Sequence, residues 1–235
     1  MQPSGRIALD PRLSMIARLV GHCDCCADIG CDHGRLGAFL LQSGQCERVL
    51  FADVSEPSLG KARTLVDNLG LSERAIFRAG DGLDVIDEPV QAVIVAGMGG
   101  TTIADILRRG RERLKGATLV LQPNVALVQL REALPECGYA IDDERVVRDG
   151  RRHYVVIRAV PGRAQYTRRE AIVGPVLLER MPPELEGYAA FRLRVAQKAL
   201  RGAVRGADDL QARALEEEIE IWEEVCACLR RRDRC

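Results

Sequence analysis

Between residues 24 and 125, short apolar runs alternate with longer stretches of helical periodicity. The apolar runs are the candidate strands, and they cover residues 25–29, 49–54, 75–79, 90–96 and 117–121. The stretches between them are the candidate helices, and they cover residues 36–42, 57–69, 101–113 and 125–134. Strands that are apolar on both faces and separated by helices are typical of a parallel sheet covered on each side. The alternation therefore predicts a doubly wound, Rossmann-like α/β domain.

The flanking segments add a helix and an edge hairpin to this domain. Asp10 followed by Pro11 is typical of a helix start, and the apolar spacing that follows predicts a helix up to residue 20. After the last helix, the extended runs 139–147 and 153–160 flank the dipeptide Asp149-Gly150, which favours a tight hairpin turn. We expect this hairpin to form an antiparallel edge of the sheet.

The C-terminal part of the chain has a different pattern. The alternation stops near residues 161–167, and from Pro183 onward the periodicity is helical, with a break at residues 202–209. Apolar residues in the last segment recur at steps of four and three, as in a coiled coil. We therefore divide the chain into an α/β domain, residues 1–162, and a coiled-coil-like α-helical hairpin, residues 163–235.

Charge and hydropathy limit the class of protein. The chain has 34 basic and 34 acidic residues, so its net charge is zero and RNA binding would depend on local patches. No apolar run approaches the roughly 18–20 residues of a membrane span, and the first residues do not form a secretory signal. We expect a cytoplasmic protein that does not contact membranes.

The nine cysteines are expected to be reduced thiols. Cys23 and Cys26 form a CxxC pair, but zinc needs two further ligands and only His22 is nearby in the sequence. We therefore expect no metal site. Cys25 and Cys26 are interpreted as small apolar residues of a buried strand.

Carboxylates and glycines follow the predicted strands. Ligands of open α/β sheets bind at the carboxyl ends of the strands, where Asp28, Asp32, Asp53 and Asp81 are found. Asp32 lies where the pyrophosphate of a dinucleotide would bind, and its negative charge disfavours NAD or FAD. S-adenosylmethionine has no phosphate, is cationic at sulfur, and offers ribose and adenine donors to carboxylates. The pattern therefore predicts an S-adenosylmethionine site.

Four motifs in this order resemble the TrmK family of bacterial tRNA (adenine-N1)-methyltransferases, which modify adenosine 22. The motifs are Ala27-Asp28-Ile29-Gly30-Cys31-Asp32-His33, Gly80-Asp81-Gly82-Leu83, Ile94-Val95-Ala96-Gly97-Met98-Gly99-Gly100 and Leu121-Gln122-Pro123-Asn124. The resemblance covers nearly the whole chain. It implies a class I methyltransferase that uses S-adenosylmethionine and acts on tRNA.

The resemblance also implies roles for individual residues. Asp28 and Gly30 would shape the methionine end of the cofactor pocket, Asp53 would bind the ribose, and Asp81 with Gly82 would meet the adenine. Asp32 matches the catalytic carboxylate of the family, although a helix cap near Gly34 is the alternative. The remaining residues of the expected site lie beside the cofactor or where the target base enters: Gly97, Met98, Gly99, Gln122, Pro123 and Asn124.

Three positions depart from the family pattern. The family commonly has an aromatic residue and then proline where Arg35 and Gly37 stand, and a tyrosine near His153. These differences concern the packing of the target base. For Met98, an ordinary core position is the alternative to packing on that base.

Local basic residues are candidates for tRNA phosphate contacts. They are Arg109 after the fourth strand, Arg151 in the hairpin, and Arg194, Lys198 and Arg201 on one stripe of the first C-terminal helix. Ion pairing of this stripe with Glu216, Glu220 and Glu223 inside the helical hairpin is the alternative. The same cofactor pocket would also suit a methyltransferase for another RNA, a protein or a small molecule, or a non-catalytic module.

Overall fold

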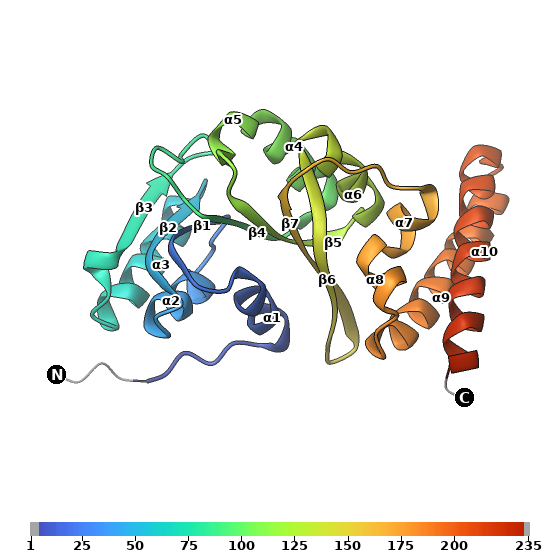
Figure 1. The fold of residues 1–235 in the computed structure, drawn as a ribbon, viewed down its shortest axis with the longest axis horizontal. Coiled ribbons are helices and arrows are strands. Elements are labelled where there is room, and N and C mark those ends of the chain that lie inside the picture. The colour runs from blue at the N-terminus through green and yellow to red at the C-terminus, as the bar shows by residue number, and fades with distance from the viewer. Residues whose placement is uncertain (1–4, 233–235) are drawn as a thin grey trace. The chain divides into compact units, whose positions relative to one another are not determined.

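Figure 1 shows the computed structural model of the protein, in which residues 5–232 are described. The chain forms two compact units, the first ending at Gln165 and the second beginning at Tyr166. This division lies three residues after the boundary expected from the sequence. Within residues 5–232, no helix combines the length and the apolar character needed to cross a membrane.

The first unit is built on a seven-stranded sheet with the strand order β3-β2-β1-β4-β5-β7-β6. Five neighbouring strands are parallel: β1 (Cys23–Ile29), β2 (Cys46–Asp53), β3 (Ala75–Ala79), β4 (Ala92–Gly99) and β5 (Thr118–Val125). The hairpin of β6 (Tyr139–Asp149) and β7 (Arg152–Pro161) is antiparallel, and β7 pairs with β5. The predicted sheet and its antiparallel edge hairpin are confirmed. The chain reverses its direction of winding between β1 and β4, which is where α/β folds bind ligands.

Helices cover both faces of this sheet. One layer contains α1 (Pro11–Val20), α2 (Arg35–Gln42) and α3 (Glu56–Asn68), followed by the short 3-10 helix Ser72–Arg74. The other layer contains α4 (Gly100–Arg109), α5 (Arg111–Leu114) and α6 (Leu127–Glu136) (Figure 1). As predicted, Asp10 caps α1, because its carboxylate accepts a hydrogen bond from the backbone N–H of Leu13.

The single helix predicted over residues 101–113 is wrong, because the structure has two helices divided at Gly110. A Cβ at this position would lie 2.3 Å from the Cβ of Leu83, so the backbone there passes directly against a core side chain. Strand β4 also continues three residues past the predicted end at Ala96. Its last residues pair irregularly with β5 around Met98.

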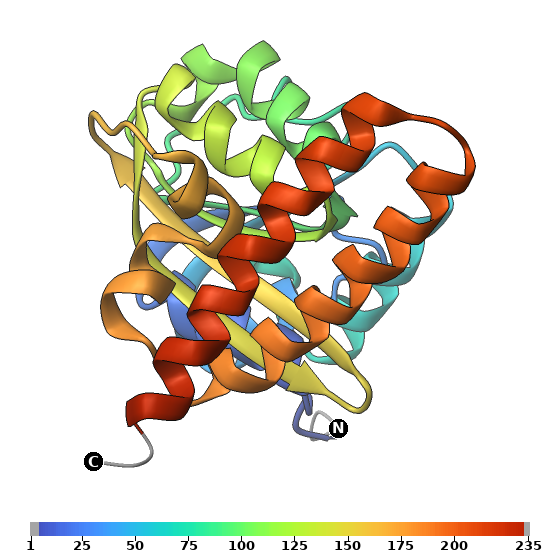
Figure 2. The same cartoon turned by 90° about the vertical axis from the view of Figure 1, so that its right-hand side faces the viewer.

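The second unit is helical. It contains α7 (Arg168–Val173), α8 (Pro175–Arg180), α9 (Glu184–Arg205) and α10 (Asp209–Arg232). Helices α9 and α10 run alongside each other as the predicted hairpin (Figure 2), with the rings of Tyr188 and Trp222 in edge contact at 5.7 Å between centroids. The sequence analysis missed α7 and α8, because six residues are too few for a helical period. The capping box of Thr167 and Glu170 is the signal that could have revealed α7.

Candidate active site

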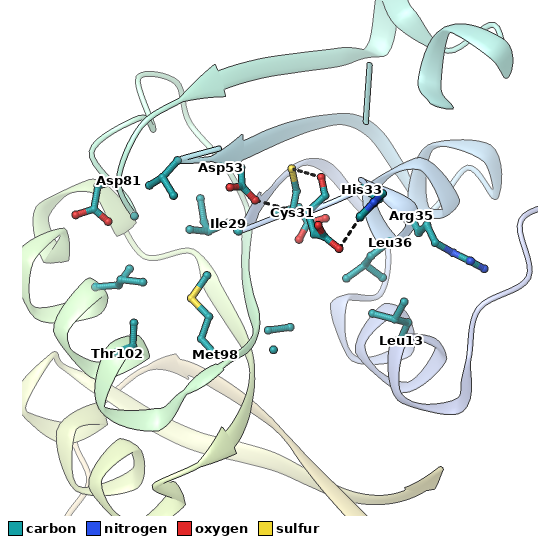
Figure 3. Close-up of a pocket in the computed structure, with 18 of the residues that line it drawn as sticks. Leu13, Ile29, Cys31, His33, Arg35, Leu36, Asp53, Asp81, Met98 and Thr102 are labelled. Carbon is teal, nitrogen blue, oxygen red and sulfur yellow. Dashed lines mark hydrogen bonds and ion pairs between the residues drawn. The ribbon is translucent and has the colours of Figure 1, made fainter. Parts of the chain in front are cut away.

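A cavity of about 980 Å³ opens at the carboxyl ends of β1, β2, β3 and β4 (Figure 3). Its size is in the range of small-molecule pockets. The structure brings most of the predicted site residues into its lining: Asp28, Gly30, Asp32, Asp53, Asp81, Gly82, Gly97 and Met98. The lining does not include Gly99, Gln122, Pro123 or Asn124.

Asp28, near the end of β1, is the buried acid of this cavity, with 5% of its surface exposed. The backbone N–H of Gly37 hydrogen-bonds to its carboxyl group, whereas Oδ2 has no hydrogen-bond partner. Burial raises the pKa of Asp28 to about 7, and the nearby Asp53 adds to the rise. A buried carboxylate oxygen without a partner is costly, so this atom suits a cationic donor. A proline at position 37 would have no N–H to offer.

Asp53, at the end of β2, organises the neighbouring loops. Its Oδ2 accepts a hydrogen bond from the backbone N–H of Asp32 at 3.0 Å, and its Oδ1 accepts one from Ser55 at 2.9 Å. Each carboxylate oxygen has two lone pairs, so both oxygens can accept a further hydrogen bond. Asp53 is therefore oriented by the backbone and still able to bind hydroxyl groups.

Asp32 does not cap the following helix. The N-cap of α2 is Gly34, and among the described residues the Asp32 carboxylate accepts no hydrogen bond from the first turn of that helix, so the helix-cap alternative is wrong. Instead the Asp32 carboxylate lies 2.7 Å from Nδ1 of His33 and has 71% of its side chain exposed. The backbone of Asp32 is left-handed, with a φ of 50°. Its carboxylate is thus at the cavity edge and open to a substrate.

His33 connects Asp32 to a lysine. Nζ of Lys61 lies 3.1 Å from Nε2 of His33. An ammonium group can only donate, so Nε2 accepts this hydrogen bond and the ring proton stays on Nδ1. Nδ1–H then donates to Asp32. The Asp32 carboxylate is oriented by this chain of contacts and accepts a hydrogen bond from His33.

Met98 lies inside the cavity instead of the core. Irregular pairing at the end of β4 and a φ of 80° at Gly97 turn the half-buried Met98 side chain toward β1 (Figure 3). A Cβ at Gly30, whose φ is 70°, would lie 2.1 Å from Cε of Met98. Only glycine fits there, and the core alternative for Met98 is wrong.

Gln122 acts behind the cavity wall. It is fully buried, accepts a hydrogen bond from Nη1 of Arg12 at 2.7 Å and donates to Oδ1 of Asn124 at 3.1 Å. Asn124 in turn donates to the carbonyl oxygen of Gly97 at 2.7 Å. The direct substrate contact expected for Gln122 is therefore corrected. Its amide is already used in holding Arg12 and the Gly97 turn.

Arg12 is a cavity residue that the sequence analysis missed. It belongs to the first turn of α1, lines the cavity, and lies over the ring of Tyr154 at 5.6 Å. Arg35 also lines the cavity and donates to the carbonyl oxygen of Ala8 at 2.6 Å. No local pattern marks Arg12, because its partner Gln122 is 110 residues away.

Two predicted residues meet at the cavity rim. Nη1 of Arg109 donates to Oδ2 of Asp81 at 2.7 Å, and both side chains are more than half exposed. Exposed pairs contribute little to stability, so a ligand can replace this contact. Arg109 itself is not among the residues that line the cavity, and its expected contact with tRNA phosphate stays a prediction.

The basic stripe of α9 is exposed. Among residues 5–232, no ion pair joins Arg194, Lys198 or Arg201 to an acidic side chain, so the pairing alternative is not observed. The hairpin is instead linked by Arg192 and Glu218 at 2.6 Å. Arg151 is also exposed, in the turn between β6 and β7.

The chain is similar to known methyltransferases. A family profile described as a methyltransferase domain matches residues 9–157. Over 158 residues the chain is 33% identical to the tRNA (adenine(22)-N(1))-methyltransferase of Bacillus subtilis (strain 168), an alignment that covers 66% of each chain.

Solved structures are similar to this chain over a larger share of its length. The crystal structure of the B. subtilis m1A22 tRNA methyltransferase TrmK has a TM-score of 0.84 and 28% identity, covering 94% of this chain and 99% of that one. Streptococcus pneumoniae Sp1610 in complex with S-adenosyl-L-methionine has a TM-score of 0.85 and 26% identity, covering 93% of this chain and 100% of that one. The similarity thus extends through the C-terminal helices.

Proposed function

The chain belongs to the TrmK family of class I methyltransferases, and from this premise we propose that it methylates N1 of adenosine 22 in tRNA with S-adenosylmethionine. The observation that carries the proposal is the cavity at the β1 and β4 switch point, with its unpartnered, buried Asp28 oxygen. Such an oxygen fits the amino group of the cofactor. A tRNA substrate also leads us to propose that the chain works in the cytoplasm.

The residues of the cavity fit S-adenosylmethionine better than a dinucleotide. Asp28 would hold the amino group, Asp53 the ribose hydroxyls, and Asp81 the adenine amine after release from Arg109. Each charge-assisted hydrogen bond contributes roughly 1.5–3 kcal/mol. When bound, S-adenosylmethionine supplies an electrophilic methyl group on a cationic sulfur. The carboxylates of Asp28, Asp53 and Asp81 in the cavity lining favour that charge, and Asp32 at the cavity edge repels pyrophosphate.

Asp32 is the proposed catalytic residue. The N1 lone pair would attack the methyl group in line while the bond from that carbon to sulfur breaks, so S-adenosylhomocysteine would leave and positive charge would develop on the adenine ring. This charge makes the exocyclic amine a stronger donor, and the exposed Asp32 carboxylate accepts its hydrogen bond or proton. Alignment of N1 with the methyl group supplies most of the acceleration, up to ~7–11 kcal/mol.

The target base has to leave its stack to reach the cavity, because N1 lies on the Watson–Crick edge. We propose that it enters beside Met98 and the Gly97 turn, which Gln122 and Asn124 hold in place. The proposed phosphate contacts are the exposed Arg109, Arg151, Arg194, Lys198 and Arg201. These side chains provide a local positive charge for binding tRNA phosphates, which the net charge of zero does not provide.

The decisive experiment maps the methylated nucleotide. Purified protein is incubated with labelled S-adenosylmethionine and an unmodified tRNA that has adenosine at position 22. The expected product is N1-methyladenosine at that position. The matched control is the same tRNA with guanosine at position 22, which should stay unlabelled. Equal labelling of the two tRNAs, or labelling only of proteins or metabolites in a parallel panel, would refute the proposal.

A further inference from the structure

Three cysteines converge at the opposite end of the sheet from the cavity. Cys23 begins β1, Cys46 begins the neighbouring strand β2, and Cys26 lies three residues further along β1. Their three sulfur atoms all lie within 4.8 Å of one another. The sulfur atoms of Cys23 and Cys46 are 3.1 Å apart. The sequence could not show this cluster, because Cys46 is 23 residues from Cys23 and meets it only through parallel strand pairing.

From this geometry we propose that Cys23, Cys26 and Cys46 form a binding site for a soft d¹⁰ metal ion, with Zn²⁺ as the physiological candidate. Thiolate sulfur is the preferred protein ligand of such ions, and zinc–sulfur bonds are about 2.3 Å long. Sulfur atoms bound to one tetrahedral ion are therefore separated by a little less than 4 Å. The observed cluster needs only side-chain rotation to reach that spacing. The site departs from the expectation that this chain binds no metal.

Strand pairing and hydrogen bonds fix the backbone around the cluster. Cys23 and Cys46 are direct partners in the parallel ladder between β1 and β2. The N–H of Cys23 donates to the carbonyl oxygen of Gln45, and the side chain of Gln45 donates to Ala17 and Gly21 at the end of α1. A rigid site of this kind avoids the ordering cost that flexible ligands would add on binding.

The solvent exposure of the cluster also allows a metal ion to reach it. Cys26 and Cys46 are fully buried, whereas Cys23 is half-buried and opens the cluster to solvent. Arg74 donates to the carbonyl oxygen of Cys46 at 2.7 Å and so fixes the backbone at the start of β2. The fourth position of the ion is left to water.

The test uses the full-length protein, reduced with a phosphine and freed of metal. Titration with Cd²⁺, an optical substitute for Zn²⁺, should produce a thiolate-to-metal charge-transfer band that saturates at one ion per chain. X-ray absorption of the Zn²⁺-loaded protein should show three sulfur ligands at about 2.3 Å. This second measurement needs no variant.

Cys46→Ala should abolish the band, and a matched control should keep it. Cys25→Ala is that control, because it removes a buried thiol of the neighbouring strand β1 that does not belong to the cluster. S-adenosylmethionine binding by each variant reports that the first unit is folded. A band of equal strength in Cys46→Ala would overturn the site. So would reduced wild-type protein that takes up no Cd²⁺ and instead forms a Cys23–Cys46 disulfide in air.

Discussion

The same residue type, aspartate, has three different environments in this active site. Asp28 is buried with one oxygen unpartnered, Asp53 is fixed by two backbone N–H groups, and Asp32 is exposed beside His33. Environment decides what each carboxylate can do, because burial disfavours charge and hydrogen bonds to the charged form favour it. The proposed roles, which are binding an amine, binding hydroxyls and accepting a proton, follow from these differences.

Asp28 makes the stability of the ligand-free protein depend on pH. Its pKa is raised from 3.8 to about 7 in the folded state. The folded protein therefore keeps this proton where the unfolded chain has lost it. As the pH rises from about 4 to about 7, we expect the free energy of unfolding to fall by up to about 4 kcal/mol from this group. Urea unfolding across this pH range measures the change.

Asp28→Asn should remove that pH dependence, because the amide cannot ionise. At pH 8 we expect the ligand-free variant to be more stable than the wild type, and to bind S-adenosylmethionine more weakly. In the wild type, affinity for the cofactor should rise with pH as Asp28 becomes charged. If the free energy of unfolding changed with pH in the same way in the wild type and in Asp28→Asn, the pH dependence would not come from Asp28.

Asp53→Ala should weaken S-adenosylmethionine binding by about 10- to 100-fold, the effect of losing hydrogen bonds to a charged group. Calorimetric titration measures this change. The control is Asp87→Ala, which removes an exposed carboxylate paired with Arg78 outside the cavity. Equal affinities for the Asp53 and Asp87 variants would exclude Asp53 from the cofactor site.

Asp32→Asn should leave cofactor affinity unchanged and slow methyl transfer by about 100-fold or more. Asparagine tolerates the left-handed backbone found at this position, so the variant removes the charge without straining the loop. Single-turnover methylation measures the chemical step, and calorimetry measures cofactor binding. A variant with the wild-type single-turnover rate would show that Asp32 does not take part in the reaction.

At the scale of elements, the close contact between α2 and β2 sets the position of the cavity wall. A Cβ at Gly37 would lie 2.4 Å from Cε1 of Phe51, which is fully buried. Glycine therefore lets the helix approach the strand. The same approach brings the N–H of Gly37 to Asp28, so packing and cofactor binding depend on one small residue.

We expect Gly37→Ala to lower the free energy of unfolding by about 1–3 kcal/mol through overpacking. The matched control is Gly60→Ala in α3, where a Cβ meets nothing within 4 Å. That control should raise stability by up to about 1 kcal/mol, because alanine is the better helix former. Chemical denaturation of both variants tests the pair. A Gly37 variant as stable as the Gly60 variant would show that α2 can move away from β2.

At the scale of the whole molecule, the proposed cofactor binding and RNA binding are assigned to different compact units. The first unit contains every residue of the cofactor cavity. The second contributes the exposed basic stripe of α9. Its helical hairpin is held together by the contact between Tyr188 and Trp222 and by the ion pair between Arg192 and Glu218. Because other groups stabilise the hairpin, the charges of the stripe are available for RNA.

Reversing Arg194, Lys198 and Arg201 to glutamate should weaken tRNA binding and reduce its salt dependence by about one unit of slope per lost phosphate contact. Cofactor binding should not change. The control reverses Glu216, Glu220 and Glu223 of the neighbouring helix to lysine, which should not weaken tRNA binding. Filter binding at several salt concentrations measures both. Unchanged tRNA affinity after reversal of the basic stripe would exclude it as a contact surface.

Local patterns in the sequence were sufficient to predict the parallel sheet, the edge hairpin and the C-terminal helical hairpin. Apolar periodicity and turn residues act over a few positions, so they can be recognised without knowing the fold. The strand-end carboxylates could be predicted in the same way, because the carboxyl ends of parallel strands meet at one edge.

Tertiary structure alone decided which side chains meet. Arg12 joins Gln122 across 110 residues, Asp81 is paired with Arg109, and Cys46 lies beside Cys23 only because β1 and β2 are paired in register. These contacts depend on the twist, register and packing of the whole sheet. No short window of sequence contains that information, because each partner is ordinary in its own segment and gains its role from the other.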